Sequence, residues 1–252
     1  MLNVLFVSLE LFPWVKVGGI ADAVAALTHA LASRGHRLTV AVPRREGVSY
    51  ETKDASSVAI VPLDIEGYAS GDLYGHDVME TSEESLRNAA LARAVMDLIA
   101  ERARSGAPFD IVHVHDWPLA MIPYLLREKR MEISPTTRSV LTIHNVAFQG
   151  VMPPEAVLHF GLDPAIHLRD DRLLFHGRAS MLKAGVVAAD ALTTVSPTYA
   201  RDLLTPEHGQ LLDDILRTRR ERGSPVHGIL NGIDTDVWNP KTDAAIATRY
   251  DV

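Results

Sequence analysis

Residues 2–42 read LNVLFVSLELFPWVKVGGIADAVAALTHALASRGHRLTVAV, and this stretch predicts a strand, a helix and a second strand in succession. Residues 2–8 are mostly apolar and are typical of a buried strand, as are residues 37–42. Between them, apolar side chains recur at spacings of four, three and four residues, which indicates a helix with one apolar face. Gly35 provides the expected end of that helix. The recurring positions are Ile20, Val24, Leu27 and Leu31.

Short apolar runs and longer helical patterns alternate along the rest of the chain. Further strands are expected at 57–63, 110–115, 138–144, 191–195 and 226–230. Further helices are expected at 83–104, 119–130, 177–189, 198–204 and 211–222. Residues 64–80 are expected to form a loop or a weak hairpin, and 145–176 to be irregular. This alternation predicts the α/β class, with residues 1–252 forming a single doubly wound, Rossmann-like domain around a mostly parallel sheet.

Composition excludes several classes of function. The formal net charge is -7 and the chain has no dense basic stripe, which argues against nucleic acid as a partner. The basic run at 217–222 falls in a helical pattern beside acids, so we expect a solvated helix face there. No cysteine is present, which excludes disulfides, thiolate nucleophiles and cysteine-based metal centres. No stretch approaches the ~20 apolar residues of a membrane span, so a soluble, cytoplasmic protein is expected.

Polar and glycine residues collect directly after the expected strands. In doubly wound sheets ligands bind beyond the carboxyl ends of the strands, so these positions are the candidates for a binding site. They are Lys16, Gly18, Gly19, His115, Asp116, His144, Asn145, Ser196, Asn231, Gly232 and Asp234.

The segment 16–22 (KVGGIAD) lies between the first strand and the first helix. Two glycines at a helix start let backbone N–H groups approach an anion, and Lys16 adds a full positive charge. The segment matches neither a GxGxxG fingerprint nor a Walker A loop, so a plain tight turn is an equal alternative to a phosphate site. Asp22 is either a charge of the helix cap region or a partner for a sugar hydroxyl.

The segment 113–117 (HVHDW) places His113 and His115 on one face of a strand. Two histidines beside Asp116 raise the possibility of a metal site, but the HxHxDH pattern of metallo-hydrolases is not matched. Core or hydrogen-bonded histidines are the competing interpretation. Trp117 is large enough to wall a sugar pocket, and buried packing is the alternative.

Three further segments are polar at strand ends. In 142–150 (TIHNVAFQG), His144 and Asn145 offer hydrogen-bond donors and acceptors for a polyhydroxy ligand, or form a polar turn closed by Gly150. Ser196 before Pro197 predicts a helix N-cap, and no GxSxG pattern makes it a nucleophile. Asn231–Gly232 indicates a sharp turn.

Taken in order, these motifs resemble the N-terminal domain of bacterial glycogen synthases and plant starch synthases. The resemblance rests on 16–22, 113–117, 142–150, 182–185 (LKAG), 193–200 (TTVSPTYA) and 230–234 (LNGID). It implies the GT-B architecture, in which two Rossmann-like domains face each other across a cleft. It further implies transfer of glucose from ADP-glucose or UDP-glucose to the non-reducing end of an α-1,4-glucan with retention of configuration, without a metal or other cofactor.

The resemblance also implies roles for individual residues. Lys16, Gly18 and Gly19 would lie near the donor diphosphate, and His144 would contact the transferring glucose. Asp22, Asp116, Asn145 and Asn231 would line the sugar side of the cleft. No acid or base is assigned in this half; the leaving phosphate is thought to help deprotonate the acceptor, so preorganised charges and dipoles would carry much of the chemistry.

The chain departs from the family pattern at three places. Pro118 stands where many members carry histidine, and the segment 62–84 is short and lacks an aromatic loop. The chain ends at Val252, about where the C-terminal nucleotide-binding domain is expected to begin. We therefore expect half a catalytic site, with a C-terminal domain as a possible partner in trans. Two alternatives stay open: a non-catalytic glucan- or partner-binding protein, and a metal-dependent hydrolase using His113, His115 and Asp116.

Overall fold

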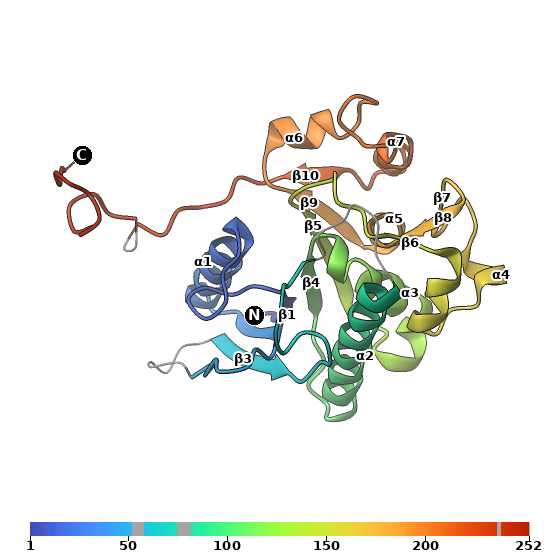
Figure 1. Ribbon diagram of the computed structural model, residues 1–252, viewed down its shortest axis with the longest axis horizontal. Coiled ribbons are helices and arrows are strands. Elements are labelled where there is room, and N and C mark those ends of the chain that lie inside the picture. The colour runs from blue at the N-terminus through green and yellow to red at the C-terminus, as the bar shows by residue number, and fades with distance from the viewer. Residues whose placement is uncertain (52–57, 75–81, 236–237, 252) are drawn as a thin grey trace.

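A computed structural model describes residues 1–51, 58–74, 82–235 and 238–251. A seven-stranded sheet forms its centre, in the order β10-β9-β5-β4-β1-β2-β3, and every neighbouring pair is parallel (Figure 1). The strands are β1 (Asn3–Val7), β2 (Arg37–Pro43), β3 (Val58–Leu63), β4 (Ile111–His115), β5 (Arg138–Ile143), β9 (Ala191–Thr194) and β10 (Val226–Gly228). The chain builds outward from β1 to β3 and then returns to β4 on the other side of β1. The predicted doubly wound α/β fold is confirmed.

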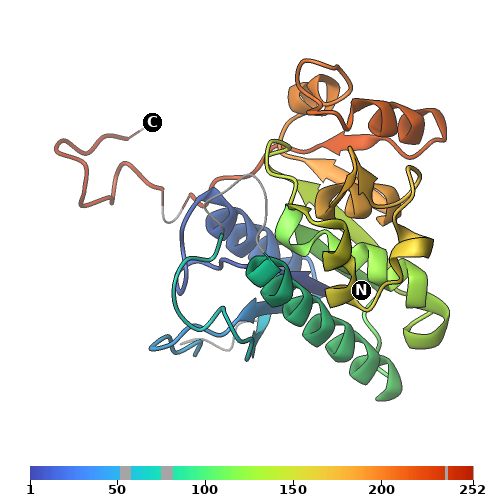
Figure 2. The ribbon, with the colours of Figure 1, turned by 45° about the vertical axis from the view of Figure 1, so that its right-hand side comes forward.

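Helices cover both faces of this sheet. Helix α1 (Gly19–Ser33) lies on one face, and α2 (Ser82–Arg104), α3 (Met121–Ile133) and α5 (Met181–Ala188) lie on the other (Figures 1 and 2). The alternation of side chains along β1 separates the two cores. Val4 and Phe6 pack in the cluster that contains α1, whereas Leu5 and Val7 join the cluster of α2, α3 and α5. Because both of its faces are buried, β1 is apolar along most of its length, as a central parallel strand requires.

A small antiparallel sheet, which the sequence did not predict, lies within the region expected to be irregular. Its strands run in the order β6-β8-β7, and short helices occur between β6 and β7. The elements are β6 (Val151–Met152), η2 (Pro154–Phe160), α4 (Pro164–His167), β7 (Leu174–Phe175) and β8 (Arg178–Ser180). Two- and three-residue strands are too short to show a period. The helix expected from 177 begins only at Met181, because β8 pairs with both neighbours and the Ser180 hydroxyl accepts from the Lys183 N–H at 3.1 Å.

Other predicted boundaries move for local reasons. The helix expected at 211–222 is α7 (Asp213–Glu221), since Gln210 and Leu211 have φ values of 48° and 66° that no right-handed helix contains. The helix expected at 119–130 divides into η1 (Trp117–Leu119) and α3. Ser196 caps α6 (Pro197–Asp202) as predicted, accepting from the Tyr199 N–H at 2.9 Å.

Two expectations fall partly outside the described residues: the start of the 57–63 strand and the end of the 64–80 loop. Beyond β10 the chain leaves the sheet and runs past α1 as an extended segment (Figures 1 and 2). Within the described ranges, no helix combines the length and apolar character needed to cross a membrane.

Candidate active site

Three polar residues follow β1, β4 and β5, which are neighbours in the sheet. Glu10 comes three residues after β1 ends, while Asp116 and His144 come directly after β4 and β5. Since parallel strands all end at the same edge, this edge gathers them into one region. The Glu10 charge acts on both Asp116 and His144.

Glu10 organises the loop in front of α1. Its side chain is 1% exposed, and its Oε2 accepts from the Val17 N–H at 2.6 Å and from the Gly18 N–H at 2.7 Å. Its Oε1 accepts from the Tyr74 hydroxyl at 2.7 Å, and burial with this carboxylate beside it raises the pKa of Tyr74. Backbone amides that the sequence suggested for a phosphate are therefore already held by a carboxylate of the chain itself.

Neither glycine of this loop is required by the backbone. Gly18 and Gly19 have no positive φ, a Cβ on Gly18 would meet only a Glu10 oxygen at 3.8 Å, and one on Gly19 would meet nothing within 4 Å. The space before Gly19 is open, and the first turn of α1 carries no side-chain cap. The first N–H groups of a helix have no acceptor within the helix, so this end of α1 suits an anionic ligand.

Lys16 and Asp22 form an ion pair across the same loop, with Nζ and Oδ2 2.8 Å apart. Their side chains are 42% and 33% exposed, so solvent screens the pair and it contributes little to stability. Asp22 lies in the first turn of α1, where its negative charge also interacts favourably with the helix dipole.

Asp116 is the junction between the β4 and β5 ends. Its Oδ1 accepts from the His144 N–H at 2.6 Å and the Asn145 N–H at 3.2 Å, so it fixes the turn that carries both residues. Its backbone has φ 60° and ψ -177°, a conformation that costs a non-glycine residue energy and that surrounding contacts must hold. Burial raises the pKa of Asp116 to about 7 against the lowering effect of these two hydrogen bonds, and the charge of Glu10 adds to the rise.

His144 is held from its other side by His115. Its Nε2 lies 3.0 Å from Nδ1 of His115, and burial lowers the pKa of His144 to about 4, so it is neutral at pH 7. The His115 Nε2 is buried without a partner. An unpaired lone pair on this buried nitrogen costs less free energy than an unpaired N–H, so the proton of His115 is on Nδ1. His115 then donates from Nδ1 to Nε2 of His144, and the proton of His144 is on its own Nδ1. His144 therefore presents a neutral Nδ1–H donor.

The histidines of β4 are stacked on each other, and one of them lies within hydrogen-bonding distance of a neighbouring strand. The rings of His113 and His115 stack at 4.6 Å and 23°, and Nε2 of His113 lies 2.7 Å from the Thr142 hydroxyl oxygen. Stacked rings do not converge their nitrogen lone pairs on one point. In the described part of the chain, no group of three or more His, Cys, Asp or Glu side chains could hold a metal ion. The hydrogen-bonded core interpretation of His113 is the one the geometry supports.

Trp117 packs in the core, as the buried-packing alternative predicted. It is 7% exposed, and its Cε3 lies 2.7 Å from where a Cβ of Gly150 would be. Gly150 has φ 55°, so glycine is required there both for the turn and for the indole.

The predicted site residues therefore divide into three groups. Asp116, His144 and Asn145 are joined by hydrogen bonds, and Lys16, Gly18, Gly19 and Asp22 belong to one loop and helix start. Asn231 is exposed in the segment after β10, whose residues Gly232–Asp234 face Asp22 across a pocket. Glu10 and Tyr74 were not predicted. Glu10 could have been noticed as a carboxylate that closely follows a buried strand. Tyr74 lies in a loop, and nothing in the sequence around it pointed to a role.

The pH dependence of stability gives a direct test of the buried Asp116. In the unfolded chain its carboxyl loses its proton near pH 3.8, whereas the folded chain keeps it to about pH 7, so its stabilising contribution disappears as pH rises through 7. Asp116→Asn keeps the acceptor oxygen and removes this effect. We expect the variant to gain roughly 2–3 kcal/mol relative to the parent between pH 5 and pH 8.5, as measured by urea unfolding.

The buried histidines act in the opposite direction. His113, with its pKa lowered to about 3, and His144 stabilise fully above pH 6.5 and less as pH falls. The parent and Asp116→Asn both contain these two histidines, so their effect cancels in the difference between the two free energies of unfolding. A parent-to-variant difference that stays constant across this range would contradict the assignment of a raised pKa to Asp116.

Comparisons with known proteins agree over nearly the whole chain. A family model described as the starch synthase catalytic domain matches residues 3–218. The chain is 39% identical to a glycogen synthase of Anaeromyxobacter sp. and 37% identical to one of Roseobacter denitrificans, with 99% of this chain covered in each case. It spans about half of these curated relatives, 56% and 55% of their lengths.

A solved structure has a similar fold over almost the whole of this chain. The catalytic domain of starch synthase IV from Arabidopsis thaliana, bound to ADP and acarbose, superposes with a TM-score of 0.84 at 26% identity. The match covers 99% of this chain and 55% of that one. Because the family model covers most of the chain and relatives well above 30% identity cover almost all of it, the chain belongs to the starch synthase catalytic domain family.

Proposed function

We propose that this chain supplies the N-terminal half of a retaining glucosyltransferase site. The reaction transfers glucose from ADP-glucose or UDP-glucose to the non-reducing end of an α-1,4-glucan, in glycogen or starch synthesis. The observation that carries the proposal is the hydrogen-bonded group of Asp116, His144 and Asn145 beside the Gly18 loop, in a chain of this family. The glycogen synthase relatives and the ADP and acarbose of the starch synthase IV structure support the substrate class.

In this proposal the residues of the chain bind and orient the donor. The neutral His144 donates from Nδ1 to a sugar oxygen without placing a full positive charge beside a glucosyl centre that itself becomes positive. The Oδ1 of Asp116 accepts hydrogen bonds from the backbone amides of His144 and Asn145. Its role in this proposal is therefore to position His144. Lys16 and the open start of α1 face the phosphates. The sugar nucleotide is a substrate, and the proposal includes no metal or cofactor.

The other half of the site would come from a C-terminal nucleotide-binding domain. Residues 1–252 alone leave one side of the donor in water, which weakens every electrostatic contact there. We therefore expect residues 1–252 to show little or no transfer on their own. We also propose a cytoplasmic location, where sugar nucleotides and glucan would meet.

Reconstitution tests the proposal. The chain is mixed with the C-terminal half of the Anaeromyxobacter glycogen synthase, and incorporation of labelled glucose from ADP-glucose or UDP-glucose into glycogen is measured. Recovered transfer that needs both halves is the expected result. Full activity of residues 1–252 alone would contradict the half-site proposal. No transfer with any C-terminal domain, together with retained glucan binding, would favour the non-catalytic alternative.

A further inference from the structure

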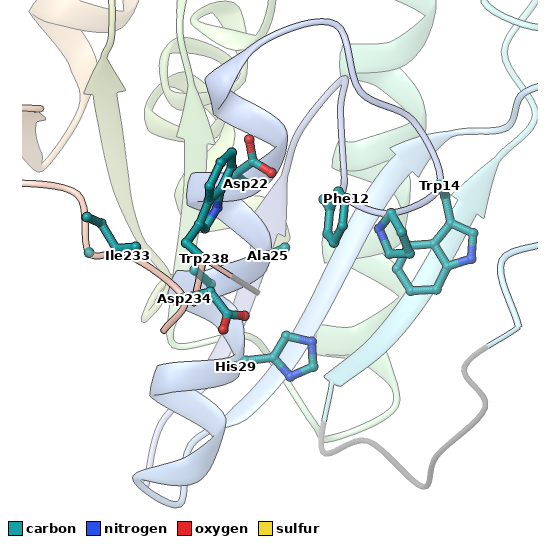
Figure 3. Close-up of a pocket in the computed structure, with 11 residues that line it drawn as sticks. Phe12, Trp14, Asp22, Ala25, His29, Ile233, Asp234 and Trp238 are labelled. Atoms are coloured by element: carbon teal, nitrogen blue, oxygen red, sulfur yellow. The ribbon is translucent and has the colours of Figure 1, made fainter. Parts of the chain in front are cut away.

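An open groove of about 560 Å³ lies at one edge of the main sheet, between β10 and α6, and a residue of α7 completes its lining. Among the described residues, its only ionisable side chains are those of Arg201, Arg220 and His227, and none of them is a carboxylate. We call it the basic groove. The described residues of its lining are all different from those of the pocket between α1 and the segment after β10 (Figure 3).

The charge of this groove is opposite to that of the chain as a whole, whose formal net charge is -7. Arg201, Arg220 and His227 are all exposed. Arg201 donates to the Thr198 hydroxyl at 3.2 Å, and within the described ranges no carboxylate forms an ion pair with any of the three basic residues. Complementary charge favours association and excludes partners of like charge. The groove therefore selects for an acidic partner.

Strand β10 directs backbone groups toward the same edge. In the described part of the chain it is the last strand of the sheet and pairs only with β9. The Ile229 N–H donates to the Thr194 carbonyl at 2.8 Å, so the backbone of Ile229 faces β9. Successive residues of a strand in a parallel ladder point their N–H and C=O groups to opposite sides, so those of Val226 and Gly228 face outward. An edge of this kind can accept a further strand.

Helix α6 lies directly against β10, which brings its side chains to this edge. A Cβ on Gly228 would be 2.3 Å from the Ser196 carbonyl oxygen, so the close approach requires glycine. Apolar side chains of α6 and β10, those of Leu204 and Val226 among them, line the groove together with the arginines. An extended segment that alternates acidic and β-branched residues has carboxylates on one face and apolar side chains on the other. Such a segment offers a partner for both kinds of side chain in the lining.

We propose that the basic groove binds an extended acidic segment of a partner protein, which joins the sheet as a strand beside β10. The backbone of the segment pairs with Val226 and Gly228, and its carboxylates pair with Arg201 and Arg220. The open edge supplies the hydrogen bonds, and the arginines select the acidic sequence. Binding there is independent of glucosyl transfer, because the site residues named above do not line the groove.

Titration of residues 1–252 with synthetic peptides tests the proposal. The probe is acetyl-EVEVEV-amide, and amide hydrogen exchange is followed by NMR. We expect saturation with the probe to slow exchange at Val226 and Gly228 by about tenfold or more, because their N–H groups then pair with the added strand. The Ile229 amide is already bonded to β9 and serves as the internal reference, which should change little.

Two comparison peptides separate the contributions of charge and of strand pairing. Acetyl-EEEVVV-amide has the composition of the probe without its alternation, and acetyl-KVKVKV-amide has the alternation with the opposite charge. Both are expected to bind at least about tenfold more weakly than the probe. Equal binding of EVEVEV and EEEVVV would contradict strand addition, and equal binding of KVKVKV would contradict the selection by charge.

Charge reversal in the groove supplies the variants. Arg201→Glu and Arg220→Glu change exposed side chains, and each is expected to weaken binding of the EVEVEV peptide by about tenfold. Arg222→Glu is the matched control, because Arg222 is exposed close to the same strand but lines a different pocket. Its affinity should stay within a factor of about two of the parent. Circular dichroism shows that each variant keeps its fold.

Three outcomes would overturn the proposal: no binding of the EVEVEV peptide, an unchanged affinity in both Arg201→Glu and Arg220→Glu, or binding that leaves exchange at Val226 and Gly228 unchanged. Inorganic phosphate is the last probe. If phosphate perturbs the signals of Arg201 and Arg220 while the peptide does not bind, the groove is a site for small anions and not for a strand. None of these results bears on the reconstitution experiment, so the two proposals succeed or fail separately.

Discussion

His144→Ala is expected to lower the rate of glucosyl transfer by about 10²-fold or more in the reconstituted enzyme. Loss of one preorganised donor to a transition state typically costs about 10²–10³-fold in rate. His144 is prepared for this role, because His115 orients its ring at 3.0 Å and the Asp116 carboxylate fixes its backbone at 2.6 Å. The initial rate with saturating ADP-glucose and glycogen is the measurement, with circular dichroism to show that the fold is kept.

His208→Ala is the matched control for this prediction. His208 is exposed and belongs to the loop before α7, where its Nδ1 lies 3.2 Å from the Thr205 hydroxyl oxygen. Its removal should leave the rate within a factor of two. A near-normal rate for His144→Ala would take His144 out of the mechanism, even if the family assignment stands.

Gly185→Ala is expected to destabilise the chain by about 2–3 kcal/mol and to lower its Tm by about 5–10 °C. A Cβ at this position would lie 2.7 Å from the Ala120 carbonyl oxygen and 2.8 Å from Cδ2 of Leu141. One of these neighbours is backbone and both lie in the core, so α5 would have to move away from η1 and β5. Thermal unfolding followed by circular dichroism measures the effect.

Gly232→Ala serves as the control for the stability measurement. A Cβ on Gly232 would meet nothing within 4 Å, and its φ is not positive. Its Tm should match that of the parent within about 1 °C. An unchanged Tm for Gly185→Ala would contradict the close approach of α5 to Ala120 seen in the structure.

The strands and long helices could be predicted because their patterns are strong over many residues. The apolar positions from Ile20 to Leu31 predicted a helix and the mostly apolar run of β1 a strand, and both elements are present. The predicted apolar face of α1 is only partly right, because Leu27 is 39% exposed and the buried face is formed by Ala21, Val24, Ala25, Thr28 and Ala32. The small sheet of β6, β7 and β8 could not be predicted, since its strands have two or three residues and are defined by partners distant in the chain. The positive φ values of Gln210 and Leu211 could not be predicted either, because neither residue is a glycine.

The site residues show the same division. Lys16, Asp116 and His144 could be named from the sequence because they follow strands of a parallel sheet. Glu10 could not be assigned a role, since only folding brings its carboxylate to the Val17 and Gly18 amides and to the Tyr74 hydroxyl. The opposed pKa shifts of Asp116 and His144 have the same origin, because burial is set by the packing around each group.

Local pattern alone predicted the α/β class, a doubly wound fold and the edge of the sheet at which the polar residues gather. These properties depend on side-chain periods and on the handedness of the backbone, which any short window of the chain expresses. Only the tertiary structure decided which amides are occupied, which histidine nitrogen carries the proton and how the segment after β10 comes to face Asp22. Each of these depends on the distance between residues far apart in the chain, and that distance exists only after the cores on both faces of the sheet have packed.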